Sequence, residues 1–336
     1  MKTGKISESV LKRSVLRLIE NNRKEVIKGA GVGEDCAFLW WEDSDRAEGR
    51  NIMATSTETV SLPVRNAAYL AVMAAANNLA ASGAVPLSVS LAIALPAGTE
   101  EIVLKELMKQ AGECCGELGI QIAGGHTEVS SSVNAPVVTA TVIGKAKEEF
   151  AGSTGGTVAE KMDIVISKWI GLEGTSIIAR EKEEELSKRY PVRLIHNAQE
   201  MDGYLSVASE AAIALKSSVY TMHDARSGGI FGALWEISRR IGVGLYIDLK
   251  KIPVKQETVE ICEFYHLNPY ALLSGGSLVM LTSDGRGLVR ALETEGIPAS
   301  IIGNTNGSND KIIVNKDETR YLEPAGPDEI LKISFN

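Results

Sequence analysis

Two glycine-containing stretches place polar side chains directly beside flexible backbone. In GVGED, residues 31–35, two glycines precede two carboxylates, and in GGHTEV, residues 124–129, two glycines precede His126, Thr127 and Glu128. Glycine lets backbone N–H groups converge on a phosphate, and a nearby carboxylate can bind Mg²⁺. Each stretch can equally be an ordinary turn with solvated side chains, and the pattern alone leaves both interpretations open.

A third stretch, HDARSGGI, leads into a predicted helix. Its polar and glycine residues are His223, Asp224, Arg226, Ser227, Gly228 and Gly229. A helix N-terminus offers unsatisfied N–H groups, and an arginine beside it recognises phosphate geometry. The stretch therefore predicts an anion site, with a helix cap and a surface ion pair as the alternative.

The composition narrows the class of function. The chain has 336 residues, 44% apolar and 23% charged, which is typical of a globular protein of two domains. A net charge of −8 disfavours nucleic acid as a partner. No apolar run reaches about 18 residues, so no membrane span is expected. The polar start, MKTGKISESVLKR, lacks the apolar core of a signal peptide, so a cytoplasmic location is expected.

The cysteines do not form a recognisable metal or redox motif. They are Cys36, Cys114, Cys115 and Cys262, and none is spaced as CxxC. We expect reduced, structural thiols.

Hydrophobic periodicity predicts an α/β fold. In the first half, strands at 51–55, 87–95 and 136–144 alternate with helices over 7–20, 66–82 and a third that Thr99 caps. The GGHTEV stretch follows a short strand and is expected as a turn. A polar segment at 145–160 predicts a linker, which divides the chain into domains of residues 1–148 and 160–336.

The second half repeats the alternation. The predicted elements are strands at 163–169 and 245–249, a turn and strand over 272–282, and helices after the turn at 171, near 202–216 and from Gly229. On that last helix Ile230, Leu234, Ile237 and Ile241 form one apolar face. The final quarter is expected to be another strand–helix–strand unit.

Taken in order, these motifs resemble the aminoimidazole ribonucleotide (AIR) synthase-related, PurM-like superfamily. The resemblance rests on GVGEDCAFL, NNLAASGAVP, GGHTEV with PVVTATVIG, GLEGTSIIA, HDARSGGIFGALWEI and LLSGGSL, which span almost the whole chain. The sequence is most similar to the HypE-like group and to uncharacterised AIR synthase-related proteins, in which GGHTE is a familiar form.

The resemblance implies a two-domain α/β fold whose N-terminal domain builds a β-barrel across a homodimer. It also implies ATP and Mg²⁺ as cofactors, and transfer of the γ-phosphate to a carboxyl or amide oxygen of an acceptor, which the sequence does not identify. Asp35 and His126 would be catalytic, and Asp35 with Glu128 would bind the metal. The nucleotide would lie against Gly31, Gly33, Glu34, Asn78, Gly124, Gly125 and Thr127, and residues 223–229 would face the acceptor or a phosphate.

Three positions depart from the acids that this superfamily uses for metal binding. They carry Ser56, Asn78 and His126 here. Mg²⁺ prefers carboxylate oxygens, so we expect weakened metal binding unless Glu58 or Glu128 compensates. The sequence ends LKISFN, without the terminal cysteine that carries the carbamoyl group in HypE, so we expect that the thiocyanate-forming reaction of HypE does not run here by that route. The alternatives are a dimeric nucleotide-binding or scaffold homologue without catalysis, and a sensor of another anion.

Overall fold

The computed structural model describes residues 3–20, 23–40, 52–147 and 161–335. These residues form two compact units, which are described separately. Unit 1 draws on the ranges 1–22, 30–34 and 152–334, and unit 2 on the ranges 23–29, 35–151 and 335–336. The expected boundary at 148–160 lies outside the described residues. The N-terminal segment and the loop 30–34 belong to unit 1, together with the C-terminal part of the chain. A single domain boundary at one linker would have assigned both segments to the N-terminal domain.

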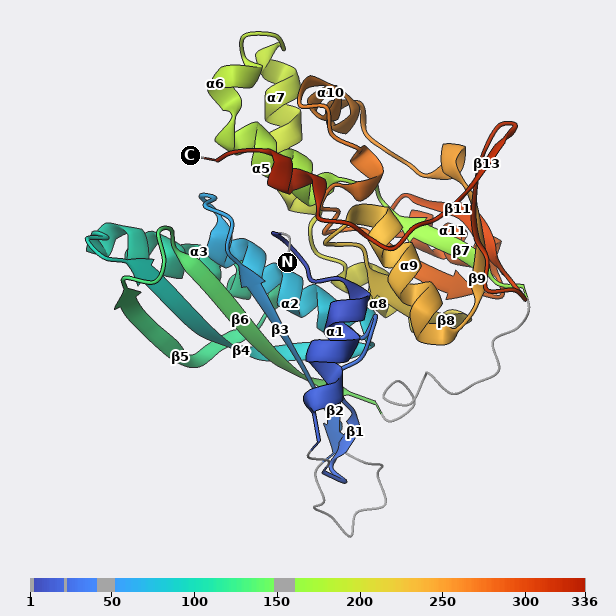
Figure 1. The fold of residues 1–336 in the computed structure, drawn as a ribbon, viewed down its shortest axis with the longest axis horizontal. Helices are drawn as coiled ribbons and strands as arrows, with labels where there is room; N and C mark the ends of the chain where they lie inside the picture. The colour runs from blue at the N-terminus through green and yellow to red at the C-terminus, as the bar shows by residue number, and fades with distance from the viewer. Residues whose placement is uncertain (1–2, 21–22, 41–51, 148–160, 336) are drawn as a thin grey trace. The chain divides into compact units, whose positions relative to one another are not determined.

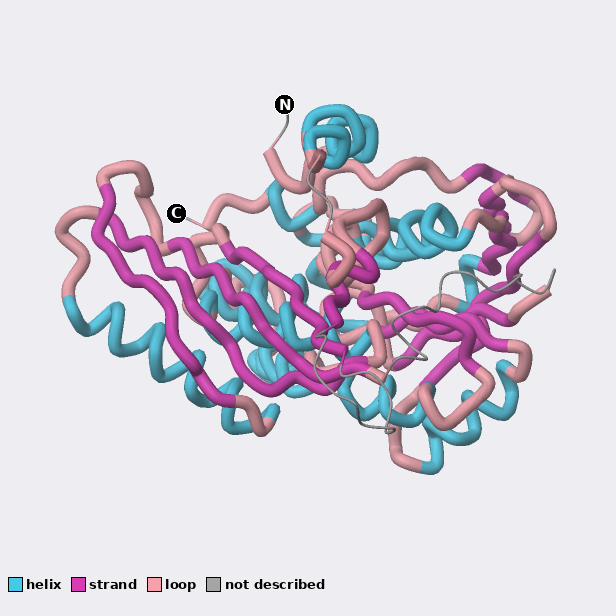
Figure 2. Tube along the Cα trace, turned by 90° about the horizontal axis from the view of Figure 1, so that it is seen from below, coloured by secondary structure: helices cyan, strands magenta, loops and turns pink. Residues whose placement is uncertain are grey.

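Unit 2 is built on a six-stranded sheet with helices on one face (Figures 1 and 2). All neighbouring strands are antiparallel except β4 and β5, which are parallel. The spatial order is β1 (Val26–Lys28), β2 (Ala37–Trp40), β3 (Ile52–Val60), β6 (Val137–Ala146), β4 (Ala84–Pro96) and β5 (Gln121–Ser130).

Two helices cover this sheet. In α2 (Ala67–Ala81) every residue except Tyr69 is buried, because small alanine side chains let the helix lie close to the strands. Helix α3 (Glu101–Leu118) packs beside it with one apolar face. Side chains along each strand alternate between the two faces of the sheet. In β6, Val138, Ala140 and Val142 point toward the helices and are fully buried.

The predicted elements of this half appear with four differences. The helix at 7–20 is shorter, α1 (Glu8–Ser14) followed by the 3₁₀ turn η1 (Leu16–Leu18). Strand β3 continues beyond the predicted end at residue 55 and reaches Val60. Thr99 does not cap α3, because Glu100 holds the cap position and the Thr99 hydroxyl donates to the Pro96 carbonyl at 2.7 Å. GGHTEV is not a turn, since pairing with β4 extends it as part of β5.

Unit 1 contains a seven-stranded sheet, antiparallel except for the parallel pair β12 and β9. Its order is β13 (Glu318–Tyr321), β12 (Lys311–Asn315), β9 (Gly244–Asp248), β11 (Ala299–Asn306), β7 (Asp163–Ser167), β10 (Leu278–Thr282) and β8 (Val219–Asp224). The helices are α5 (Leu172–Glu181), α6 (Glu183–Leu186), α7 (Val192–Gln199), α8 (Ala208–Ala214), α9 (Gly229–Ile241), α10 (Gln256–Phe264) and α11 (Gly285–Thr294), with 3₁₀ turns η2 (Glu200–Tyr204), η3 (Leu249–Lys251), η4 (Pro269–Ala271) and η5 (Glu329–Lys332).

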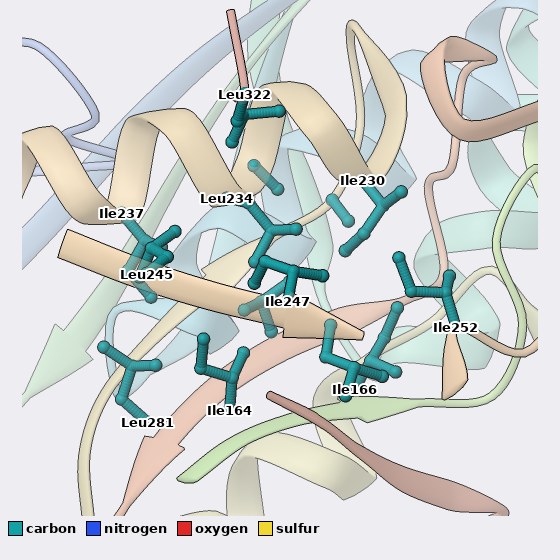
Figure 3. Close-up of a cluster of buried hydrophobic side chains, with 14 of the residues drawn as sticks. Ile164, Ile166, Ile230, Leu234, Ile237, Leu245, Ile247, Ile252, Leu281 and Leu322 are labelled. Carbon is teal, nitrogen blue, oxygen red and sulfur yellow. The ribbon is translucent and has the colours of Figure 1, made fainter. Parts of the chain in front are cut away.

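The core of unit 1 lies between α9 and the sheet (Figure 3). Ile230, Leu234 and Ile237 of α9 are fully buried in one cluster with Ile164 of β7 and Ile247 of β9. Burying each such side chain contributes about 1.5–3 kcal/mol. The predicted apolar face of this helix is therefore confirmed. No helix in the described residues is long and apolar enough to cross a membrane.

Candidate functional site

In unit 2, the side chain of Asn78 joins helix α2 to strand β3. Its Nδ2 donates to Ser56 Oγ at 3.0 Å and to Glu58 Oε1 at 3.0 Å. Residues 56 and 58 share a strand face, so both point toward α2. The buried Cys36 thiol donates to the Asn78 carbonyl at 3.3 Å. The structure thus brings Ser56, Glu58 and Asn78 together in one group, the Asn78 cluster. Cys36, which follows Asp35 in the chain, lies beside this cluster.

This cluster is poor in metal ligands. The two positions expected to carry acids contribute a hydroxyl and an amide, and the amide N–H groups point at the available oxygens. Glu58 supplies one carboxylate, a residue that the sequence left as one of two candidates for compensation. Across the described ranges, no three His, Cys, Asp or Glu side chains gather where they could hold a metal. The donor set fits a weakly held Mg²⁺ and not a tight site.

His126 and Glu128 lie on strand β5, at the edge of the sheet. The His126 side chain is 72% exposed, and its Nε2 lies 3.3 Å from Glu128 Oε2. Residue 126 pairs with Ala92 of β4, Ala92 pairs with residue 139 of β6, and residue 139 pairs with Thr59 of β3. These four residues therefore lie side by side across the sheet and point to the same face. Thr59 points away from the face that carries Glu58, because adjacent strand residues alternate.

His126 and Glu128 are therefore separated from Asn78 within one chain. They lie on the opposite face of the sheet, and strands β6 and β4 intervene, which is three strand spacings or roughly 14 Å. Within a single chain, His126 and Glu128 therefore do not lie beside Ser56, Glu58 and Asn78. The prediction that Glu128 and Asp35 bind one metal ion would require Glu128 to lie near those residues.

The two glycines of GGHTEV have different surroundings. Gly125 has φ +154°, and a Cβ there would lie 1.9 Å from the Leu91 carbonyl oxygen of the neighbouring strand. A Cβ at Gly124 would meet no heavy atom within 4 Å. Strand packing therefore requires glycine at 125, whereas Gly124 has room beside it for a ligand. Thr127 points toward the helix face with its partner Ile93.

The loop of residues 30–34 packs on helix α9 of unit 1. Gly33 has φ +74°, and a Cβ there would lie 2.5 Å from the Glu236 carbonyl oxygen. Arg240 Nη1 donates to the Gly33 carbonyl at 3.2 Å. A Cβ at Gly31 would contact only the flexible Glu34 side chain. Close packing accounts for the glycine at 33, and Gly31 is the more accessible of the two.

His223, at the end of β8, is buried against α9. Its Nε2 lies 3.0 Å from Glu236 Oε2, and the other Glu236 oxygen accepts from Lys5. Burial alone would raise the pKa of Glu236, but the hydrogen bond and charge of His223, together with Lys5, lower it to about 2. The neighbouring Asp224 is also buried, and its charge acts on the Lys168 ammonium. These two residues are thus part of a buried charge network.

The predicted anion site before α9 is occupied by the chain's own carboxylates. Arg226 donates to Glu173 from Nε at 3.2 Å and from Nη2 at 3.0 Å. Gly228 lies between Ser227 and Gly229, the first residue of α9. Its N–H donates to Asp328 Oδ2 at 2.7 Å. An anionic ligand here would compete with Glu173 and Asp328.

Sequence reasoning missed Asp328, Glu173, Glu236 and Arg240. Asp328 also accepts from the Leu273 and Ile330 amides at 3.1 and 3.0 Å. Burial raises the pKa of this carboxyl to about 6 against the opposing effect of these hydrogen bonds. Glu173 stood in the glycine motif GLEG and could have been found there. Apart from the Ile330 amide that Asp328 accepts from, the partners of the other three are distant in sequence, so no local pattern identifies these residues.

The four cysteines are free and buried, as predicted. Burial raises the pKa of Cys262 to about 12 and raises the pKa values of Cys114 and Cys115 as well. Thiols held protonated in this way are poor nucleophiles.

Two family models match the chain. Residues 33–146 match the N-terminal domain of AIR synthase related proteins, and residues 162–315 match the C-terminal domain. The carbamoyl dehydratase HypE of Rhizobium leguminosarum bv. viciae is 27% identical over 239 residues, 70% of this chain and 66% of that protein. The HypE of Azotobacter vinelandii is 25% identical over 334 residues, 92% and 93% of the two chains.

Solved structures show the same fold. A HypE–HypF complex contains a chain that matches with a TM-score of 0.72 and 22% identity, covering 94% of this chain and 99% of that one. HypE in complex with ATP matches with a TM-score of 0.69 and 18% identity, covering 98% of both chains. The predicted two-domain α/β fold of the PurM-like type is thereby confirmed.

Proposed function

The chain belongs to the AIR synthase related protein family, and on this premise we propose that it is an ATP-dependent phosphoryl-transfer enzyme. Its acceptor would present a carboxyl or amide oxygen. The observation that carries the proposal is the match over nearly the full length of a HypE bound to ATP. The relatives named carbamoyl dehydratase support an amide or carbamoyl oxygen as the target.

The proposed nucleotide contacts come from the glycine loops. Gly31, with Glu34 and Gly33 in the same loop, would approach the phosphates through backbone N–H groups. Gly124 has open space beside it, which allows close approach of a ligand. Asn78 would contribute a neutral oxygen, since its N–H groups already serve Ser56 and Glu58.

Two residues would take part in the transfer itself. Asp35 would hold Mg²⁺, with Glu58 beside Asn78 as a second carboxylate, and the ion would neutralise charge on the phosphates. His126 is exposed on β5 and has Glu128 at 3.3 Å, which can orient its ring. Within one chain His126 lies on the sheet face opposite Ser56, Glu58 and Asn78, so the imidazole would have to reach the transferred group from a second copy, where it would donate a hydrogen bond to a developing negative charge or accept a proton from the acceptor.

The proposal includes a homodimer. The sheet face opposite α2 carries small polar side chains, with hydrogen-bonded pairs Thr57–Thr141 at 3.0 Å and Thr59–Thr139 at 2.9 Å. Strand β5 is exposed along nearly its whole length and has an open edge. A second copy on this face would cover His126 and Glu128 and place them in an interface.

The test is ADP formation in the presence of small carboxylates and primary amides. We expect Asp35→Asn to reduce the rate by at least about 100-fold, since charge stabilisation of this kind contributes several kcal/mol to phosphoryl transfer. Glu113→Gln, an exposed acid on α3, is the matched control and should keep the wild-type rate. Equal ADP formation by Asp35→Asn and wild type would contradict the proposal.

A second candidate function is nucleotide binding without turnover. The hydrogen bond between Ser56 and Asn78, at the two positions where acids were expected, favours it. Such a protein would bind an ATP analogue equally with and without Mg²⁺ and would form no ADP with any acceptor.

A further inference from the structure

Helix α9 has a polar face as well as the apolar face that packs on the sheet. Residues 235, 236, 239 and 240 share this polar face because they are spaced by one helical turn. Their hydrogen-bond partners include residues of the N-terminal segment, the loop 30–34 and strand β8, all of unit 1, and Lys311 of β12 lies 4.9 Å from the centroid of the Trp235 ring. The polar face of α9 therefore holds chain segments that are about 200 residues distant in sequence.

Arg240 makes the contact with the loop. Its Nη1 donates to the Gly33 carbonyl at 3.2 Å, and its Nη2 donates to Thr221 Oγ1 at 2.7 Å and to the Met222 carbonyl. One guanidinium therefore fixes the loop backbone to the middle of β8. The planar, always charged guanidinium suits this use because several N–H groups donate from one rigid group.

Glu236 supports the same loop one turn earlier. Its backbone carbonyl lies where a Cβ of residue 33 would be, so the loop backbone packs directly on the helix. Its side chain bridges Lys5 and the buried His223. Arg239, by contrast, binds Glu8 at 2.9 Å, to which Trp235 also donates, and no contact between Arg239 and the loop is among the described hydrogen bonds.

We propose that Arg240 is a positioning residue, which holds the backbone of residues 31–34 in the conformation that binds the nucleotide phosphates. This inference rests on the proposed function for its ligand. Its structural part, the restraint of the loop by α9, stands on the contacts of Arg240 and Gly33 alone. Asp35 follows the restrained loop directly in the chain, so the same restraint acts on the backbone that leads to it.

The experiment compares Arg240→Met, Arg240→Lys and the matched control Arg239→Met. The control removes a guanidinium from the same helix face but leaves the Gly33 contact intact. Hydrogen–deuterium exchange of the peptide covering residues 30–36 is measured without ligand, and binding of the non-hydrolysable analogue AMPPCP by calorimetry. We expect Arg240→Met to speed exchange of this peptide at least five-fold and to weaken analogue binding at least ten-fold. Arg240→Lys should recover part of both effects, and Arg239→Met should show neither.

Wild-type exchange in Arg240→Met would overturn the restraint, whatever the nucleotide result. Faster exchange with unchanged analogue affinity would overturn the positioning role while leaving the restraint. If the wild type itself does not bind the analogue, the proposed function fails, and exchange still decides whether Arg240 restrains the loop. Should Arg240→Met fold poorly, Gly33→Ala breaks the same packing from the loop side, and Gly29→Ala, where a Cβ would meet only the Val26 side chain at 3.7 Å, is its matched control.

Discussion

The side-chain amide of Asn78 donates a hydrogen bond of 3.0 Å to the carboxylate of Glu58. The same amide donates to Ser56, so N–H groups face the oxygens at a position where a cation would be expected. An amide can satisfy one carboxylate without a metal ion. This relationship explains how the chain can tolerate neutral residues at both positions, and it predicts what restoring the acids would do.

Restoring both acids should make folding stability depend on Mg²⁺. In Ser56→Asp with Asn78→Asp, three carboxylates including Glu58 would lie close together, and their repulsion should lower the unfolding midpoint in EDTA. Millimolar Mg²⁺ should recover it, because carboxylates are its preferred ligands. Thermal unfolding with Mg²⁺ or EDTA measures this. Lys109→Glu, which changes the net charge equally on an exposed face of α3, should show no response to Mg²⁺; the same response in both proteins would contradict the interpretation.

The two glycines of GGHTEV should respond differently to alanine. Gly125→Ala should lower the free energy of unfolding by at least about 2 kcal/mol, since a Cβ would collide with the Leu91 carbonyl and strain the backbone. Gly124→Ala should be nearly neutral for stability but should weaken nucleotide binding if the ligand approaches there. Urea unfolding of both variants decides the first point, and similar losses in both would show that the strand geometry is misassigned.

Lys168 and Glu210 form a buried ion pair in unit 1. Nζ of Lys168 also donates to the Tyr204 and Ser206 carbonyls, at 2.8 and 2.7 Å, so the ammonium is well satisfied. Burial lowers the pKa of Lys168 against the effect of Glu210. Glu210→Ala should cost about 3–5 kcal/mol of unfolding free energy, because it leaves a buried charge uncompensated.

Adding Lys168→Met to Glu210→Ala should recover part of that loss. The double variant removes the buried charge along with its partner, so the two effects should not add. Urea unfolding of both single variants and the double variant measures the coupling. Additive losses would mean that the ion pair contributes nothing specific.

Asp328 should make stability depend on pH near neutrality. Its pKa is raised by burial from 3.8 to about 6 in the folded protein, so between these values the folded state binds more protons than the unfolded state. The free energy of unfolding therefore rises as pH falls from 7 to 5, by about 1 kcal/mol for this group. The low pKa values of Glu8 and Glu236, about 2, keep those groups ionised across this window.

The difference between wild type and Asp328→Asn isolates this effect. Replacement changes the hydrogen bonds at every pH but removes the titration, so the stability advantage of the wild type should grow on going from pH 7 to pH 5. The exposed Asp317→Asn should follow the wild-type profile. Parallel profiles for wild type and Asp328→Asn would show that the carboxyl is not held as described.

The sequence predicted most elements because their periodicity is strong. The apolar spacing of Ile230, Leu234 and Ile237 leaves little choice for α9, and the alanine-rich helix between residues 66 and 82 has clear ends. The start of strand β5 was predicted, but its continuation through GGHTEV was missed because a glycine pair usually marks a turn. Its extended form depends on pairing with β4, and its exposure on both faces removes the alternation that identifies a strand.

The candidate site was less predictable than the fold. The family resemblance identified Ser56 and Asn78, and the structure places them in hydrogen-bond contact. It gave no sign that Gly33 packs on the Glu236 backbone or that the Gly228 N–H donates to Asp328. Such contacts join residues 100 or more positions apart, and no local pattern reports them.

Calorimetric titration of the purified wild-type protein with AMPPCP, with and without Mg²⁺, tests the central claim most directly. An ATP-dependent enzyme with the weakly held metal proposed here should bind the analogue with micromolar affinity and lose at least ten-fold of it in EDTA. Absence of binding under both conditions would contradict the account, and Mg²⁺-independent binding would support nucleotide binding without turnover instead.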